Sequence, residues 1–449
     1  MIENGIFSEY GLKSSQPSPV NQMMSQFAQD FRPGIDINLG VGYVNEDTIP
    51  YNEFADIVRE LVNKENRPSN LLNYGGPEGS KRLIDSLKEF YNILYKNGKT
   101  GFVPDFENRE VVIGVSGATS ILTGLANILK KGVVISTDPL YYIFTSTLER
   151  YNFEIAPIEE DDEGPRIDIL EQTLESLHKA GKYISCCYFV TVNNPTCVVV
   201  SNYRRKQIVE CLETWAKKID TKIPLFFDLA YEWLIHDTQL PYPVLPSMFD
   251  NCESVYEIGT LSKVFAPALR VGYIISPKNS ALLKSLIQWN SDVGFSAPLI
   301  TQEISAELIR KVGLKQFEFV NTGYRERGTL LKDKFNQKMG QYIESITGGS
   351  AGFYLYLTLK GIPTFPDSDL FMLLSRKSGI KDWDYNVDNI VNKRVVYLPG
   401  IYCVHPQGTL SEAGKYQLRV SYGYENIGAL LQAVDIFVKA IGLIKRQKV

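Results

Sequence analysis

The sequence is poor in the residues that bind metals or form disulfide bonds. Its 449 residues include only three histidines, and none of them is spaced as a pair of metal ligands. The six cysteines show no CxxC spacing, and most of them lie within apolar runs. We therefore expect neither a zinc site nor a disulfide framework. Unpaired cysteines in apolar runs are typical of proteins kept reduced, which favours a cytoplasmic location.

The sequence also lacks an excess of basic residues. Lysine and arginine number 47 against 51 aspartates and glutamates, so the formal net charge is −4. A slightly acidic chain without a polybasic run gives no reason to expect nucleic acid as a partner. No long apolar segment is evident, and residues 1–15 lack the pattern of a signal peptide, so no membrane partner is expected either.

The rest of the composition is that of a globular protein, with 44% hydrophobic and 22% charged residues. Apolar strands alternate with helical patterns through much of the chain. The predicted strands are 111–115, 132–137, 153–158, 183–192, 223–231, 254–259 and 271–276. Continuous apolar strands between helices indicate a mostly parallel sheet with helices on both faces, which predicts an α/β fold.

The pattern changes in the last third of the chain, where a long charged helix is predicted from Leu314 to about Lys338. Two short apolar runs and a terminal helix follow it. We predict a large domain (46–310) and a smaller α+β domain (311–449), to which residues 1–45 contribute. Residues 363–394 are predicted to be a surface excursion.

Residues 259–273, GTLSKVFAPALRVGY, place two cations between two predicted buried strands. Lys263 and Arg270 lie seven residues apart in this stretch. Buried strand ends do not normally tolerate two unpaired cations. The stretch therefore predicts an anion held near Arg270, or a lysine that is not charged.

Other predicted strands also end in polar residues, and ligands of open α/β sheets bind at such strand ends. A helix start, hydroxyls and an arginine together fit a phosphate group. An acid, a phenol, an amide and an amine fit a polar heteroaromatic ring. The residues concerned are Gly117, Ala118, Thr119, Asn194, Asp228, Tyr231, Thr260, Ser262, Lys263 and Arg270.

A set of short motifs extends in register over most of the chain. They are Leu39-Gly40, Tyr74-Gly75-Gly76-Pro77-Glu78-Gly79, Pro139-Leu140-Tyr141, Asn194-Pro195-Thr196-Cys197, Asp228-Leu229-Ala230-Tyr231, TLSKVFAPALRVGY, Pro399-Gly400-Ile401-Tyr402 and Leu418-Arg419-Val420-Ser421-Tyr422. Each motif is weak alone, but their common order makes a chance match very improbable. The sequence resembles the fold-type-I, class I/II aminotransferases that use pyridoxal phosphate, and in particular the aromatic, kynurenine and 2-aminoadipate aminotransferases.

The resemblance implies pyridoxal 5'-phosphate as the cofactor and assigns its ligands. Lys263 would form the Schiff base and then act as general acid and base, and Asp228 would keep the pyridine nitrogen protonated. Asn194 and Tyr231 would donate to the ring oxygen, and Tyr141, rather than the adjacent Tyr142, would stack on the ring. The phosphate ligands would be Gly117, Ala118, Thr119, Thr260, Ser262 and Arg270, and we expect Arg270 to be buried together with the phosphate.

The resemblance also implies the substrates and the assembly. Arg419 would bind the α-carboxylate of the amino acid, with Asn194 assisting and the Gly40 backbone close by. A 2-oxo acid such as 2-oxoglutarate would accept the amino group in a ping-pong reaction. Tyr74 would reach the phosphate of a neighbouring subunit, which implies a homodimer with shared active sites.

Two positions depart from the family pattern, and neither removes a catalytic group. Cys197 replaces a glycine, so its turn either adopts another conformation or carries strain. Ala268 replaces a second glycine near the phosphate loop. The side chain of the substrate is not readable, although Tyr43, Phe295, Tyr402 and residues 15–35 are candidates to line its pocket.

Other interpretations stay open from the sequence alone. Asp228 could instead cap a helix, Asn194 could form an ordinary turn, and Arg419 could be a structural ion-pair partner. The Ser262 hydroxyl could bond the backbone rather than a phosphate. The same scaffold also supports β-lyases, decarboxylases and synthases. A non-catalytic regulatory protein of this fold is a further alternative, which the filled catalytic positions and the lack of a DNA-binding extension disfavour.

Overall fold

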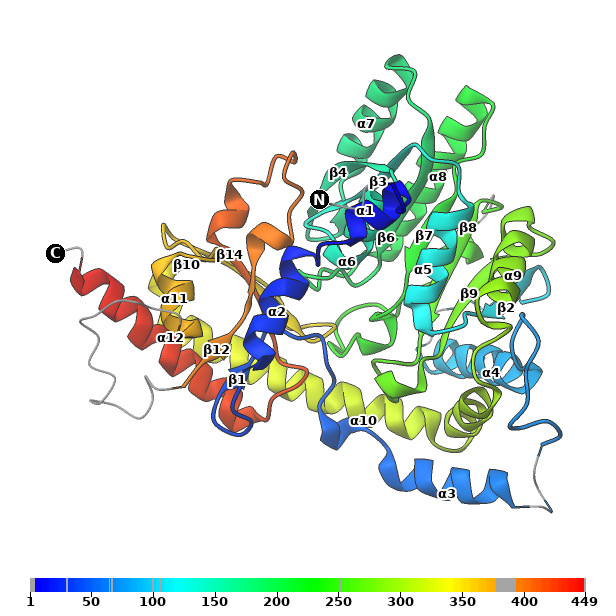
Figure 1. The fold of residues 1–449 in the computed structure, drawn as a ribbon, viewed down its shortest axis with the longest axis horizontal. Coiled ribbons are helices and arrows are strands. Elements are labelled where there is room, and N and C mark those ends of the chain that lie inside the picture. The colour runs from blue at the N-terminus through cyan, green and yellow to red at the C-terminus, as the bar shows by residue number, and fades with distance from the viewer. Residues whose placement is uncertain are drawn as a thin grey trace.

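The computed structural model describes residues 5–447 except positions 30, 64, 66–67, 99–100, 103, 105, 250–251 and 377–392. Its described residues form an eight-stranded sheet, a four-stranded sheet and a two-stranded pair. Figure 1 shows the larger sheet with its helices on one side of the molecule and the smaller sheet on the other, with the helix α10 (Leu299–Met339) running along both.

The larger sheet has the strand order β2-β9-β8-β7-β6-β3-β4-β5. Its strands are β2 (Arg109–Ile113), β3 (Val133–Asp138), β4 (Glu154–Asp161), β5 (Gly164–Pro165), β6 (Ile184–Val190), β7 (Leu225–Asp228), β8 (Val255–Thr260) and β9 (Gly272–Pro277). The strands β8, β7, β6, β3 and β4 pair in parallel, whereas β9 is antiparallel to both of its neighbours. The predicted mostly parallel α/β sheet is confirmed.

Adjacent residues of the central strands enter two separate hydrophobic cores. Phe226 of β7 packs in one core with Leu125 and Leu286, and the next residue, Phe227, packs in the other core with Leu212. Helices α5 (Gly117–Ile128), α6 (Tyr142–Arg150) and α9 (Ala281–Gly294) contribute to the first core, and α4 (Lys81–Asn97), α7 (Ile167–Lys179) and α8 (Asn202–Ile219) to the second. Because both faces are covered, the strands read as continuous apolar runs.

The smaller sheet is antiparallel, in the order β10-β11-β14-β13. Its strands are β10 (Ile343–Gly348), β11 (Tyr354–Leu359), β13 (Leu398–Pro399) and β14 (Gln417–Ser421). Beside it, β1 (Ile37–Asn38) pairs in parallel with β12 (Val395–Val396). This pairing attaches the N-terminal segment to the C-terminal part of the chain. The predicted domain boundaries stay predictions, and α10 runs without a break through residues 310 and 311.

Helix α10 is much longer than the sequence predicted, because it begins at Leu299 rather than Leu314. Its first part packs against α4 and α3 (Tyr51–Val62), and its last part against β10 and α12 (Ile427–Gln447). Polar residues such as Gln302 and Glu303 are buried in its first part, which obscures the amphipathic pattern that would have predicted a helix there.

The predicted surface excursion at 363–394 is wrong for its described first half. Residues Asp369–Ser375 form helix α11, in which Leu370 is 1% and Phe371 3% exposed. The Phe371 ring lies 5.7 Å from that of Tyr397, so this helix contributes to the core of the smaller sheet. Residues 377–392 lie outside the described residues.

The C-terminal helix contains the long apolar run that the sequence analysis overlooked. Among the described residues, Ile427–Arg446 is long and apolar enough to cross a membrane by length and composition alone. Its Phe437 is fully buried, with ring centroids 5.9 Å from Phe335 of α10 and 5.8 Å from Tyr397. The apolar residues of α12 thus serve the core between α10 and the smaller sheet.

Candidate active site

A cavity of about 480 Å³ lies where the carboxyl ends of the parallel strands face the smaller sheet. The N-terminal segment and helix α2 (Pro19–Gln29) border it on a third side. Twelve of the predicted site residues line this cavity: Gly40, Ala118, Thr119, Tyr141, Asn194, Asp228, Tyr231, Thr260, Ser262, Lys263, Arg270 and Arg419. Gly117 and Tyr74 are not among its lining residues.

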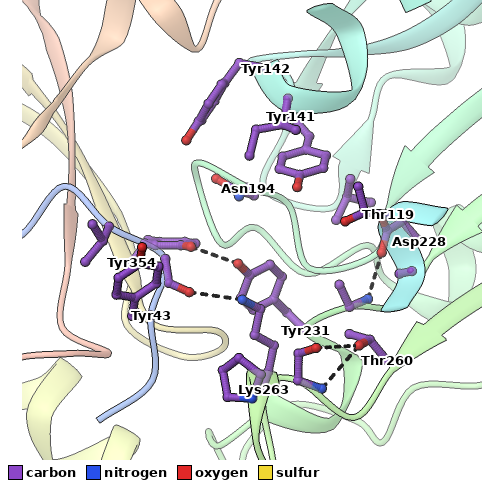
Figure 2. Close-up of a pocket in the computed structure, with 18 of the residues that line it drawn as sticks. Tyr43, Thr119, Tyr141, Tyr142, Asn194, Asp228, Tyr231, Thr260, Lys263 and Tyr354 are labelled. Carbon is purple, nitrogen blue, oxygen red and sulfur yellow. Dashed lines mark hydrogen bonds between the residues drawn. The ribbon is translucent and has the colours of Figure 1, made fainter. Parts of the chain in front are cut away.

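Lys263 follows strand β8 and extends into the cavity (Figure 2). Its Nζ donates a hydrogen bond to the Gly42 carbonyl oxygen at 3.0 Å. Burial, followed by the nearby charges of Arg419 and Arg270, lowers the pKa of Lys263 to about 8. A substantial fraction of this amine is therefore uncharged near neutral pH, as a nucleophilic lysine requires.

Asp228 is the last residue of β7 and is only 3% exposed. One carboxylate oxygen accepts a hydrogen bond from the Tyr188 hydroxyl at 2.6 Å, and the other accepts one from the Ala230 backbone N–H at 2.8 Å. Burial raises the pKa of Asp228, and these two hydrogen bonds oppose the rise. A carboxylate held in this way is an acceptor ready for one further donor, such as a protonated ring nitrogen.

The phenol and amide predicted to surround a ring are both present. The Tyr231 hydroxyl lies 2.8 Å from the Tyr354 hydroxyl, and the Asn194 side-chain oxygen accepts a hydrogen bond from Arg419 at 2.7 Å. The Asn194 amide nitrogen is thereby left as the donor toward the cavity. Tyr141 and Tyr142 both line the cavity, with ring centroids 6.1 Å apart, so the preference for Tyr141 as the stacking ring stays a prediction.

The predicted phosphate ligands gather around the start of helix α5. Gly117 has a φ of +67°, which favours glycine, and a Cβ built there would lie 2.8 Å from an Arg270 terminal nitrogen and would displace that guanidinium. The Thr260 and Ser262 hydroxyls lie 2.9 Å apart. A helix N-terminus beside hydroxyls and an arginine is a suitable anion site.

The expectation that Arg270 is buried is wrong. The residue is exposed, and its guanidinium donates to the backbone oxygens of Pro267 and Ser116, both at 3.2 Å. Its backbone is left-handed, with φ of 52°, and its side chain lines the cavity while remaining exposed. Thr119 is likewise exposed at this mouth.

Arg419 is the most enclosed cation of the cavity, with 1% exposure. Besides its bond to Asn194, it donates to the Gly40 carbonyl oxygen at 2.7 Å, and its guanidinium lies 4.1 Å from the ring centroid of Tyr354. Its Nε is buried and has no hydrogen-bond partner among the described residues. A carboxylate in the cavity would neutralise this charge.

Some of the other predicted positions line the cavity, and others do not. Tyr74 is 76% exposed, with its ring 5.1 Å from that of Phe295, so it does not contribute to the cavity of its own chain. Of the candidate pocket residues, Tyr43 lines the cavity, whereas Phe295 and Tyr402 do not. The segment 15–35 contributes Val20, Asn21 and Met24 from α2.

The two positions that depart from the family pattern, Cys197 and Ala268, differ in their backbone conformation. Cys197 keeps a left-handed backbone, with φ of 53°, so its turn carries mild strain. Its buried sulfur lies close to Gly352, where a built Cβ would approach it to 2.5 Å. Ala268 lies in a short 3₁₀ helix, Pro267–Leu269, without a positive φ, and needs no glycine.

The sequence analysis missed two tyrosines of the site, Tyr188 and Tyr354, and named Tyr142 only as the alternative to Tyr141. Tyr188 holds Asp228, and Tyr354 contacts both Tyr231 and Arg419. The alternation of β6 and β11 shows which strand residues share a face, but no signal in the sequence singled these out among 26 tyrosines. The described residues contain no group of three or more His, Cys, Asp or Glu suited to a metal ion.

Residues 35–423 match the family model for aminotransferase class I and II. The chain belongs to this family. The sequence predicted this family together with its cofactor, pyridoxal phosphate. The donor set of the cavity fits this cofactor, because it offers an amine for the aldehyde, a carboxylate for the ring nitrogen, and hydroxyls, a helix N-terminus and an arginine for the phosphate.

Curated relatives include an uncharacterized aminotransferase of Saccharolobus solfataricus, 26% identical over 61% of this chain and 64% of that protein. Aromatic-amino-acid aminotransferase 1 of Thermococcus litoralis is 24% identical over 81% of this chain and 79% of the relative. An uncharacterized HTH-type transcriptional regulator of Bacillus subtilis is 24% identical over 60% of this chain and 51% of its own length. The aligned part thus spans just under two thirds of the first relative and about half of the regulator.

Solved structures share the complete fold. The multiple substrate aminotransferase of Thermococcus profundus superposes with a TM-score of 0.80 at 22% identity, covering 99% of this chain and 100% of the other. The kynurenine aminotransferase of Pyrococcus horikoshii gives a TM-score of 0.79 at 21% identity, covering 98% and 97%. The predicted architecture of the fold-type-I, class I/II aminotransferases is confirmed.

Proposed function

We propose that this protein transfers the α-amino group of an amino acid to a 2-oxo acid such as 2-oxoglutarate, in a ping-pong reaction. The observation that carries the proposal is one cavity lined by the Lys263 amine, the Asp228 carboxylate and the buried Arg419 guanidinium. Pyridoxal 5'-phosphate, when bound, supplies an aldehyde that takes up the amino group and a ring that withdraws electrons from the substrate Cα.

Lys263 is the proposed proton carrier. With a pKa lowered to about 8, its Nζ can take the proton from the substrate Cα and return it during the same half-reaction. Asp228 would accept a hydrogen bond from the ring nitrogen and stabilise its protonated form, a charge-assisted contact that contributes about 1.5–3 kcal/mol. Tyr231 and the Asn194 amide would donate to the ring oxygen.

Arg419 is the proposed carboxylate site. A guanidinium presents its N–H groups in a planar fork that matches a carboxylate. The bonds from Arg419 to Asn194 and to the Gly40 carbonyl fix the plane of this fork. The substrate Cα would then be held at a constant position relative to the Lys263 amine.

The lining of the cavity favours substrates with an uncharged, bulky or aromatic side chain. Its only cations among the described lining residues are Lys263, Arg270 and Arg419, each of which already has a proposed role. The remaining wall near α2 consists of Val20, Asn21 and Met24. An apolar wall with one amide suits an aromatic amino acid better than the second carboxylate of 2-aminoadipate.

The test is a spectral half-reaction. Purified holoenzyme is mixed with single amino acids, including kynurenine and 2-aminoadipate, and conversion of the bound cofactor to its pyridoxamine form is followed by absorbance. We expect aromatic amino acids to convert it fastest and 2-oxoglutarate to reverse the change. Release of ammonia, carbon dioxide or a cleaved side chain without pyridoxamine would favour a lyase, decarboxylase or synthase instead.

The regulatory alternative draws support from the HTH-type relative, because that regulator aligns with this family's region. A regulator would bind the cofactor but need not catalyse a reaction. Absence of half-transamination across the whole amino-acid panel, with the cofactor fully bound, would favour this alternative over an enzyme.

We also propose a homodimer located in the cytoplasm. The exposed pair of Tyr74 and Phe295 supports the dimer, since a large aromatic pair on a surface is suited to contact with a second chain. Six free cysteines, five of them buried, are compatible with a reducing compartment. Light scattering would test the dimer, and cell fractionation would test the location.

A further inference from the structure

The hydroxyl of Tyr354 is the part of the cavity that the proposed reaction leaves without a role. Tyr354 is the first residue of β11 in the smaller sheet, whereas Tyr231 follows β7 in the larger sheet. Their hydroxyl oxygens lie 2.8 Å apart, and both rings are buried (Figure 2). The hydrogen bond therefore joins the two parts of the chain at the cavity.

The surroundings fix the Tyr354 ring from two sides. On one face the Arg419 guanidinium lies 4.1 Å from the ring centroid, a distance that suits a cation–π contact. At the hydroxyl, the N-terminal segment passes so closely that a Cβ built on Gly42 would lie 2.6 Å from the oxygen. Tyr354 thus has little freedom to swing its hydroxyl away from Tyr231.

The protons of the pair decide what this contact does. Each phenol has one proton, and either hydroxyl can be the donor. If Tyr231 donates to Tyr354, it has no proton left for a third partner. If Tyr354 donates, Tyr231 is free to donate to a group in the cavity.

We propose that Tyr354 is a positioning residue that donates its hydrogen bond to Tyr231 and so directs the Tyr231 proton to the ring oxygen of the cofactor. A hydroxyl that accepts one hydrogen bond becomes a stronger donor in the next, because the two bonds polarise each other. The stronger donor stabilises negative charge on the ring oxygen. This inference rests on the cofactor assigned above, but not on transamination.

Both phenols keep their protons in the working range of pH. Burial raises the pKa of Tyr231 well above its ordinary value, and it raises the pKa of Tyr354 to about 12. The pair therefore stays neutral at neutral pH, and each of its two hydroxyls keeps one proton to donate.

The first experiment compares Tyr354→Phe with Tyr356→Phe in the isolated holoenzyme, with no substrate present. Tyr356 lies two residues along the same strand and does not line the cavity. Its hydroxyl donates a hydrogen bond to the Gln417 side chain at 2.9 Å, so Tyr356→Phe is a matched control that also removes one buried hydroxyl. The readout is the pH midpoint of the visible absorbance change of the bound cofactor. We expect Tyr354→Phe to raise this midpoint by about half a pH unit, and Tyr356→Phe to leave it in place.

The second experiment places Tyr354→Phe in a Tyr231→Phe background. Because Tyr354 acts through Tyr231, its removal should then shift the midpoint no further. Gly42→Ala, which crowds the Tyr354 hydroxyl, should reproduce part of the Tyr354→Phe shift. Equal midpoints in Tyr354→Phe and wild type, or a full shift that persists without Tyr231, would overturn the proposal.

These outcomes are distinct from a failure of the proposed function. A wild-type protein that shows no pH-dependent cofactor absorbance would contradict the cofactor assignment itself. A normal wild-type titration with an unchanged Tyr354→Phe midpoint would refute only the role of Tyr354. A Tyr354→Phe variant whose KM for the amino acid changes while the midpoint stays would place the hydroxyl at the substrate instead.

Discussion

The two sides of the cavity are built in different ways. Its floor, Asp228, Thr260 and Lys263, follows two neighbouring strands of one parallel sheet within 36 positions of sequence. Its roof, Gly42, Tyr354 and Arg419, comes from three distant segments that meet only because the smaller sheet and the N-terminal segment approach the larger sheet. The floor therefore holds its geometry by strand pairing, whereas the roof depends on how the two parts of the chain are packed. We infer that the floor carries the proton transfer, whereas the roof binds the substrate through Arg419 and adjusts the cofactor through Tyr354.

Replacing the floor amine should have the largest effect. Lys263→Ala removes the proposed proton carrier, so we expect kcat to fall by about 10⁴-fold, at the upper end of general acid–base contributions. Borohydride reduction followed by mass spectrometry should find no cofactor attached to the chain. The exposed Lys284 on α9 provides the control, since Lys284→Ala should keep both activity and attachment. A reducible attachment that persists in Lys263→Ala would show that the anchor is another residue.

Changing the roof cation should affect recognition more than chemistry. Arg419→Lys keeps the positive charge but loses the planar fork, so we expect kcat/KM to fall by about 100-fold, chiefly through KM. The cofactor should stay bound as in wild type, because Lys263 and Asp228 are unchanged. Steady-state kinetics with the best amino acid would measure kcat and KM separately. A fall in kcat alone would show that Arg419 acts in the chemical step rather than in substrate recognition.

The pH dependence of cofactor attachment tests the floor without a substrate. Lys263 must be uncharged to react, and its pKa is lowered to about 8. The rate at which the apoenzyme captures pyridoxal 5'-phosphate should therefore rise about tenfold per pH unit below that value and level off above it. Stopped-flow absorbance from pH 6 to 10 would measure this rate. A rate that still rises steeply at pH 10 would mean that the amine is an ordinary lysine.

The smallest effect is expected at the start of helix α5. Gly117→Ala places a Cβ 2.8 Å from an Arg270 nitrogen and in a left-handed backbone, so we expect a loss of stability of about 1–2 kcal/mol and weaker cofactor binding. Gly323→Ala in α10 is the control, because a Cβ there meets no atom within 4 Å and helix propensity favours alanine. Thermal unfolding of the apoenzyme and cofactor titration would separate the two effects. Unchanged cofactor binding in Gly117→Ala would remove the start of α5 from the phosphate site.

The sequence predicts the floor far better than the roof. Lys263 and Asp228 stand at the ends of apolar strands, where the alternation of strand and helix already indicates a binding edge. Arg419 was found only through a motif, because nothing in its local pattern shows that β14 faces the larger sheet. Tyr354 was missed altogether, since its contact with Tyr231 spans 123 positions of sequence.

Errors of the sequence analysis share a physical cause. A sequence shows which residue types are present, but not the path of a side chain or the partner of a helix face. Arg270 was expected to be buried, yet it is exposed and donates to two backbone oxygens. Helix α10 was predicted too short, because its first part buries polar as well as apolar residues and so loses the usual periodicity.

Helix α10 has a consequence for recombination between relatives of this protein. Its 41 residues contact α3 and α4 of one part and α12 of the other, so it packs against both parts of the chain. A chimera that joined two parents within Leu299–Met339 would mismatch the packing against one of those parts. A crossover before Leu299 would transfer the helix together with the whole C-terminal part, so Tyr354 and Arg419 would keep the helix against which their sheet packs.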